Sequence, residues 1–151
     1  MGTMTPKFEA SLPAVDAWVA REAEGLSAAQ CLHLFELAFE HLWKTSSLTI
    51  SILTLQAVLS RALFHGSETY PFLSEIGLDD AGLHWQELRK AKAYSNRDEL
   101  LAGLACLLAG FIVILGNITN QVITAQLCEE LNAVKYVPKM KVVKGKNGEV
   151  E

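Results

Sequence analysis

The residues with the widest chemical scope in this sequence are four histidines and three cysteines. His33 stands three residues before Glu36, and His41 directly follows Glu40, within a stretch of helical pattern. Helical di-metal sites use imidazoles and carboxylates, but they need Glu-x-x-His on two helices and further glutamates. Here the order is reversed and the sequence holds no second copy. We therefore expect no metal site and no cofactor.

The cysteines are Cys31, Cys106 and Cys128, an odd number with no Cys-x-x-Cys pair. Two of them lie in apolar helical patterns, which is typical of reduced core residues in an intracellular protein. Apolar surroundings raise the pKa of a thiol, so these residues are poor nucleophiles. The sequence has no phosphate-binding glycine motif, and residues 1–13 have no apolar signal region. We expect a cytoplasmic protein that is not an enzyme.

One segment carries a resemblance to phosphotransfer proteins. Residues 39–50 read Phe-Glu-His-Leu-Trp-Lys-Thr-Ser-Ser-Leu-Thr-Ile. The segment resembles the phospho-accepting helix of histidine kinase dimerisation domains. It also resembles histidine phosphotransfer domains, in which a Lys follows the His by three residues. The resemblance implies that His41 accepts a phosphoryl group whose charge Lys44 offsets. It covers twelve of the 151 residues, with Ser in place of the family's Pro and Leu48 one residue late.

Charge is divided unevenly between the body and the end of the chain. Residues 1–134 carry 8 Lys and Arg against 15 Asp and Glu, a balance of −7. Residues 135–151 carry 5 Lys against 2 Glu, a balance of +3. Nucleic-acid binding draws its affinity from clustered cations, so an acidic body excludes nucleic acid as the main partner.

The elements that must position these residues are helices. Apolar residues recur at steps of three and four, and Ser27 with Gln30 forms a capping box. We place helices over residues 13–25, 27–44, 48–63, 80–93 and 98–132, with Gly66 beyond the third and Asp79 or Asp80 capping the short fourth. In the connection between the third and fourth helices, residues 71–76 can form one helical turn. The sequence predicts an all-α bundle of four main helices in one domain, 1–134, and a short basic tail or extended arm, 135–151.

The last helix is the strongest feature, because residues 100–115 contain no charge. A membrane span needs about twenty apolar residues, and the polar residues that follow make a buried central helix the better interpretation. One stripe along it is small and then polar, which suits close approach of another helix. We expect it to form a packing or dimer interface comprising Gly103, Cys106, Gly110, Asn117, Asn120 and Thr124.

From these features we expect a non-enzymatic helical interaction or dimerisation module, of a kind used in bacterial signal transduction, with a second copy or another protein as partner. Three alternatives stay open. The first is a histidine phosphotransfer module using His41. The second is a protein anchored in the membrane by a single span. The third is a binder of an apolar small molecule within the bundle, where Gly103 and Gly110 leave room.

Overall fold

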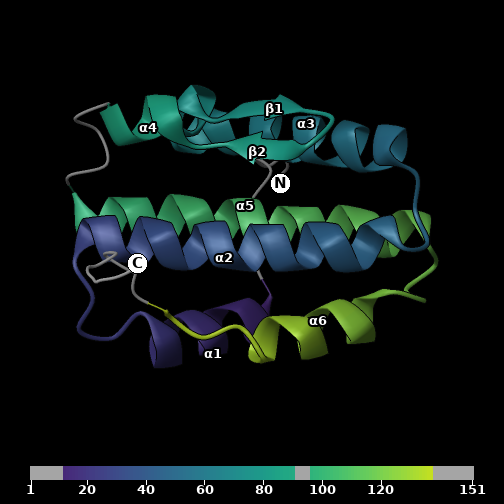
Figure 1. Cartoon of the computed structure of the whole chain (residues 1–151), viewed down its shortest axis with the longest axis horizontal. Coiled ribbons are helices and arrows are strands. Elements are labelled where there is room, and N and C mark those ends of the chain that lie inside the picture. The colour runs from purple at the N-terminus through teal and green to yellow at the C-terminus, as the bar shows by residue number, and fades with distance from the viewer. Residues whose placement is uncertain (1–11, 91–95, 138–151) are drawn as a thin grey trace, which may run out of the picture.

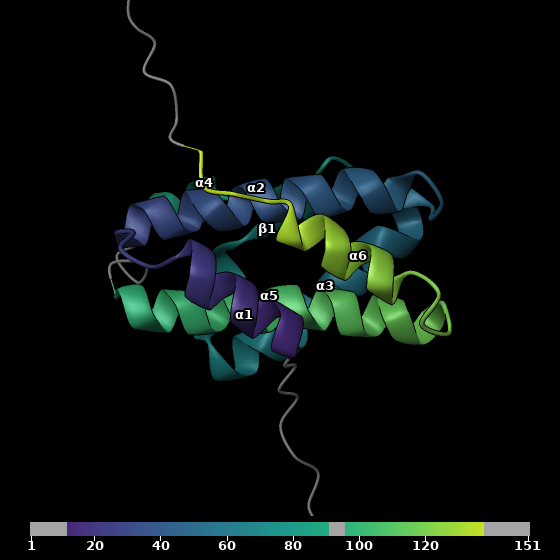
Figure 2. The same ribbon diagram turned by 90° about the horizontal axis from the view of Figure 1, so that it is seen from below.

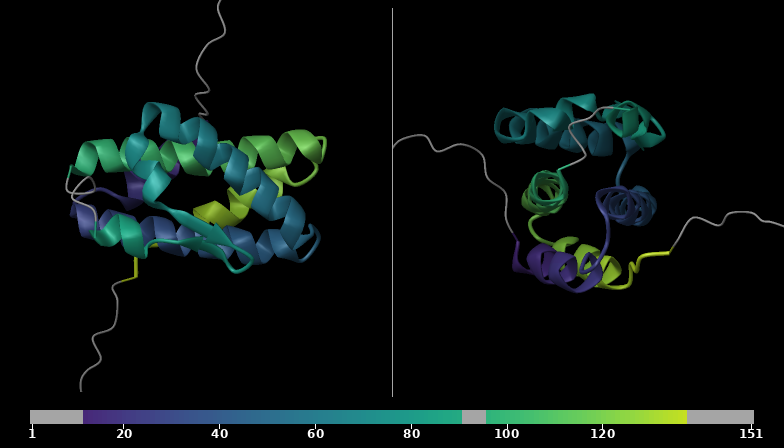
Figure 3. Two further views of the ribbon diagram at one scale, coloured as in Figure 1. Left: turned by 90° about the horizontal axis from the view of Figure 1, so that it is seen from above. Right: turned by 90° about the vertical axis from the view of Figure 1, so that its left-hand side faces the viewer.

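The computed structural model describes residues 12–90 and 96–137, and these form three layers of secondary structure (Figure 1). The middle layer consists of two long helices side by side, α2 (Ala28–Ser47) and α5 (Arg97–Ile118). An end-on view shows the two helices between the outer layers (Figure 3). The prediction of an all-α bundle around a long central helix is confirmed.

The outer layers contain the shorter elements. One holds α3 (Ile52–Thr69), the 3₁₀ turn η1 (Pro71–Glu75), the strands β1 (Gly77–Asp79) and β2 (Gly82–His84), and α4 (Gln86–Lys90). The other holds α1 (Pro13–Glu22) and α6 (Thr124–Asn132), which cross beneath α2 and α5 (Figure 2). The middle helices are thereby covered from two sides.

Side-chain caps fix where the long helices begin. Ser27 and Gln30 form the predicted capping box, each side chain bonding the other's backbone N–H. Ser51 Oγ accepts the N–H of Thr54 at the start of α3, and Asn96 Oδ1 accepts that of Glu99 at the start of α5. Each cap satisfies a donor that the first helical turn leaves unpaired.

The core surrounds α5, which contacts α1, α2, α3 and α6. Leu104, Leu108 and Phe111 of α5 are buried, as are Trp18 and Phe35, whose rings meet edge to face with centroids 5.3 Å apart. The Trp18 indole N–H also donates to the Val134 carbonyl at 3.0 Å. This buried bond fixes the chain beyond α6 to α1.

The predicted helix over residues 80–93 is wrong at its start, where the chain forms an antiparallel hairpin of β1 and β2. Asp79 does not cap a helix. Its Oδ1 accepts the N–H of Ala81 at 2.8 Å, while its Oδ2 lies 2.6 Å from His84 Nε2. Gly82 takes a φ of +113°, which L side chains rarely adopt. These local bonds compete successfully with helix formation.

Gly66 does not end the third helix as predicted. It is buried inside α3, where a Cβ would lie 2.8 Å from Leu73 Cδ1. The helix continues to Thr69, and Pro71, which lacks a backbone N–H, opens η1 at the predicted turn. The glycine therefore serves the close approach of η1 to α3.

The predicted helix over residues 98–132 is broken in two. Asn120 and Gln121 have φ values of +57° and +70°, so the chain turns between α5 and α6. The Gln121 N–H donates to the Gly116 carbonyl at 2.6 Å, the bond of a Schellman-type helix end. An Asn residue tolerates this left-handed conformation better than most, which makes Asn120 a suitable stop.

The predicted basic tail falls mostly outside the described residues. Residues 135–137 are described and form no strand, and the rest of the predicted tail or arm, 138–151, lies outside the described residues.

Candidate functional site

Large apolar side chains are exposed at one end of the molecule. Two lie at the corner between α2 and α3, Leu48 just after α2 and Leu53 in the first turn of α3, and they are 81 % and 78 % exposed. Two lie at the corner between α5 and α6, Ile118 at the end of α5 and Val122 in the turn, and they are 56 % and 81 % exposed. Both connections lie at the same end of the middle layer (Figures 1 and 2). We call residues 48–53 and 118–122 the uncharged end.

The helix boundaries place these side chains outward. Ile50 N–H donates to the Ser46 carbonyl as α2 ends, and Ser51 caps α3 two residues before Leu53. At the second corner, the left-handed turn directs the Val122 side chain outward, whereas the next residue, Ile123, is buried in the core. Because each corner is tight, its apolar side chains lie beyond the layers that could cover them.

The sequence around this end contains no charge. No Asp, Glu, Lys or Arg occurs from 45 to 60, and none from 100 to 128. The exposed residues between the apolar ones are all uncharged: Thr49, Ser51, Asn120 and Gln121. Exposed apolar clusters of this kind on a folded protein often mark contact surfaces. Sequence reasoning missed it by assigning Leu48 to the core stripe of a helix, although the uncharged run 45–60 was a visible signal.

The small half of the predicted interface stripe faces the chain's own residues. Gly103, Cys106 and Gly110 are buried. At Gly103 an added Cβ would lie 2.4 Å from Phe72 Cζ and 3.2 Å from Tyr70 Cβ, so η1 fills the space beside it. A second chain or a small ligand reaching Gly103 would have to displace Phe72.

The polar half of the stripe lies where α5 ends and the chain turns into α6. Asn117 and Asn120 are exposed, and Thr124 starts α6. Gln121 Nε2 donates to Asn117 Oδ1 at 3.1 Å, and Thr124 Oγ1 donates to Gln121 Oε1 at 2.7 Å. These bonds brace the turn; Asn117 still belongs to α5, whereas Asn120 and Thr124 lie beyond its end.

His41 connects two layers. Its Nε2 lies 2.6 Å from Glu130 Oε1 of α6, and its side chain is 42 % exposed. The ammonium of Lys44 lies 3.2 Å from Glu40 Oε2, so this cation already pairs with a carboxylate of its own helix. The structure therefore brings His41 to Glu130 and Lys44 to Glu40, and it gives both residues partners that the resemblance to phosphotransfer helices does not include.

Within residues 12–90 and 96–137, no group of three or more His, Cys, Asp or Glu side chains is placed to hold a metal ion. Cys31 and Cys106 are buried and Cys128 is partly exposed. Burial raises the pKa of the Cys31 thiol, against a smaller opposing effect of Arg97, and it also raises the pKa of Cys128. The expected poor nucleophilicity of Cys31 is consistent with that direction.

By length and composition, α5 could cross a membrane, and it is the one helix in the described parts of the chain that could. However, 61 % of its most apolar window is buried by the surrounding protein. The central helix of a folded domain passes the same test.

Comparison with known proteins gives no relative: no family model, no curated protein and no solved structure matches this chain.

Proposed function

We propose that this protein is a non-enzymatic interaction module that associates with a second copy of itself through the uncharged end. The observation that carries the proposal is the exposure of Leu48, Leu53, Ile118 and Val122 at two corners of the same end. Burying these side chains against another protein removes apolar area from water, at about 25 cal/mol for each Å².

Charge allows a second copy as the partner at this end. The chain carries a formal charge of −4, so two copies repel each other at long range. At the uncharged end they can meet without placing like charges together. A contact across a two-fold axis uses the same patch on both chains, so one apolar patch is sufficient. Because the patch is small, we expect weak, concentration-dependent association.

Sedimentation velocity over a wide range of concentrations tests this directly. The wild type should shift from monomer to dimer as concentration rises. The double substitution Leu53→Ser and Val122→Ser should lower the association constant at least tenfold, in line with about 1.4 kcal/mol or more of lost burial. Both side chains are exposed, so the monomer should keep its helical content.

Phe64→Ser is the matched control, because Phe64 is also a large apolar residue, 65 % exposed, but lies further along α3. It should leave the association constant unchanged. A wild type that stays monomeric at every concentration would refute self-association. Binding of the monomer to neutral lipid vesicles, lost in the double variant, would instead assign the uncharged end to a membrane surface.

A further inference from the structure

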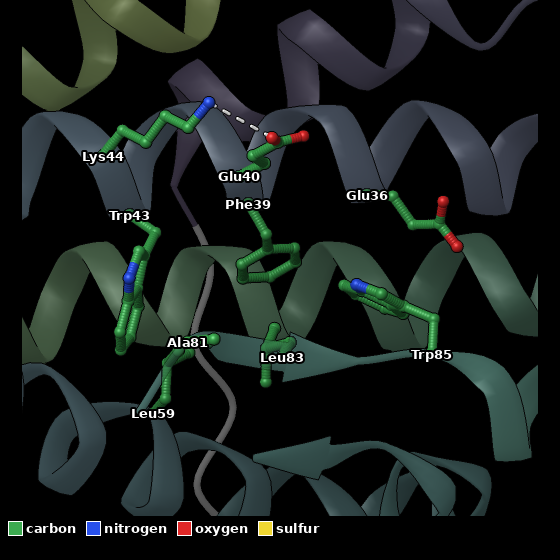
Figure 4. A pocket seen from close by; sticks show the side chains of 10 residues that line it. Glu36, Phe39, Glu40, Trp43, Lys44, Leu59, Ala81, Leu83 and Trp85 are labelled. Atoms are coloured by element: carbon green, nitrogen blue, oxygen red, sulfur yellow. Dashed lines mark ion pairs between the residues drawn. The ribbon is translucent and has the colours of Figure 1, made fainter. Parts of the chain in front are cut away.

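A pocket of about 320 Å³ lies between α2 and the β hairpin, apart from the uncharged end (Figure 4). Five of its residues come from α2 at positions 36, 39, 40, 43 and 44, which form one face of the helix. β2 and the hairpin turn supply the opposite wall, and Leu59 of α3 contributes from below. This volume is at the lower end of the range for small-molecule sites, about 300–1,000 Å³.

Three aromatic rings form its walls. Phe39 and Trp85 are buried with ring centroids 5.6 Å apart, and Trp43 stands on the other side of the opening (Figure 4). The Trp43 indole lies over the backbone of Gly82, where an added Cβ would be 3.6 Å from Cδ2. That is an ordinary van der Waals distance; the glycine is needed here for its φ of +113°, which closes the hairpin turn beneath the indole.

Two of these rings keep unused hydrogen-bond donors. Among the described residues, neither the Trp43 nor the Trp85 indole N–H has a partner, whereas that of Trp18 donates to Val134. The Trp85 nitrogen lies at the end of the ring nearer Phe39 (Figure 4). An N–H donor needs an acceptor, which an ammonium group does not offer, so these two groups serve here as reporters of a ligand and not as its contacts.

Carboxylates line the α2 side of the pocket. Glu36 is largely buried and is held by Arg89 of α4. Glu40 pairs with Lys44 at 3.2 Å, but both side chains are well exposed, and such pairs contribute little free energy. Lys44 also lines the pocket, but its side chain is 73 % exposed, so its ammonium can turn to solvent while Glu40 pairs with a cation in the pocket.

We propose that this pocket binds a small organic cation, of the alkylammonium or quaternary ammonium class. The π faces of tryptophan and phenylalanine are electronegative, and they attract a cation within about 6 Å of the ring centre. Three such rings beside Glu40 favour a positive ligand over a neutral one of the same shape. This inference is independent of the proposed self-association.

Two probes of nearly identical shape test the charge requirement. Choline carries a trimethylammonium group, and 3,3-dimethylbutan-1-ol replaces its nitrogen by carbon. Each is titrated into the ¹⁵N-labelled full chain, whose three tryptophans give three indole N–H signals. Choline should shift the signals of Trp43 and Trp85 in a saturable way and leave that of Trp18 in place. Its affinity should exceed that of the alcohol by about threefold to thirtyfold.

Variants separate the two sources of attraction. Glu40→Gln should weaken choline binding severalfold without changing the affinity for the alcohol. Glu129→Gln, on α6 in the opposite layer, removes one carboxylate elsewhere and should change neither. Trp43→Phe should keep part of the preference for choline, and Trp43→Leu should abolish it. In both variants, binding is measured through the indole N–H signal of Trp85.

Equal affinity for the two probes would overturn the proposal and leave an apolar pocket. So would the absence of saturable binding by choline, or shifts that Glu40→Gln and Trp43→Phe leave unchanged. If Trp43→Leu fails to fold, the comparison of Glu40→Gln with Glu129→Gln decides, because both glutamates lie on the surface of their helices.

Discussion

The ring of Phe72 lies against the backbone of Gly103 so closely that a Cβ on the glycine would stand 2.4 Å from Cζ. Phe72 belongs to η1 and Gly103 to the central helix α5, so this contact fixes one outer layer to the middle of the molecule. A glycine in a helix costs about 1 kcal/mol relative to alanine. Here the close approach of a buried ring offsets that cost.

Gly103→Ala should therefore destabilise the protein, although alanine is the better helix former. Phe72 is buried and has little room to move, and overpacking costs about 1–3 kcal/mol. After the gain in helix propensity, we expect a net loss of about 1–2 kcal/mol, measured by urea denaturation.

Gly116→Ala is the matched control in the same helix. Its added Cβ would meet Thr124 Oγ1 and Gln121 Oε1, which are the ends of side chains that are not buried. These can rotate away at the cost of the hydrogen bond between them, so the free energy of unfolding should fall less than in Gly103→Ala. An equal or larger loss at Gly116 would show that the Phe72 contact is not the tighter one.

The sequence patterns predicted the helices well where caps and periodicity agree. The Ser27–Gln30 box, the helix over residues 27–44 and the charge-free centre of α5 all depend on local residues, and all appear in the structure. Tertiary contacts decided the rest. Gly66 looked like a helix end, but the approach of Leu73 gives it a place inside α3.

The pocket and the uncharged end were beyond the sequence for a related reason. Trp43, Trp85 and Phe39 meet only because the chain after Gly77 forms a hairpin that returns to α2. The segment containing Asp79 and Asp80 also fits a helix start, and nothing local excludes it. Leu48 is apolar in a periodic pattern, and only the corner between α2 and α3 reveals that it is exposed.

Asn120→Ala distinguishes a turn from a continuous helix by the sign of its effect. In a continuous helix, alanine would stabilise by about 0.5 kcal/mol. At a φ of +57°, alanine loses the tolerance that asparagine has for the left-handed region, and we expect a loss of about 1 kcal/mol. Thermal unfolding followed by circular dichroism measures the change. A raised Tm would contradict the break between α5 and α6.

The hairpin should weaken in acid through Asp79. The N–H of Ala81, and then the bond to His84, hold the pKa of this carboxyl below its ordinary value. A group whose pKa is lower in the folded state stabilises above its ordinary pKa, and the contribution disappears as pH falls through the folded value. The backbone amide signal of Ala81 should therefore titrate below about pH 4.

Asp79→Asn should remove this titration, because the amide oxygen still accepts from Ala81 but does not ionise over that range. Asp80→Asn, one residue along the turn, should leave it in place. A transition of the Ala81 amide that survives Asp79→Asn would show that another group controls the hairpin in acid.

The three thiols should react in an order set by burial. Cys128 is partly exposed and Cys31 and Cys106 are buried, so a disulfide reagent should reach Cys128 first in the folded protein. Because burial raises the pKa of Cys128, its thiolate fraction is small at neutral pH, and the rate should rise through pH values above about 8.5. Cys128→Ser should abolish this first phase, while Cys31→Ser should leave it unchanged.

In denaturant all three thiols should react at similar rates. Rapid labelling of Cys31 in the folded state would mean that the contact between α2 and the segment around Leu26 opens readily, since its Sγ lies 3.9 Å from the Leu26 carbonyl oxygen.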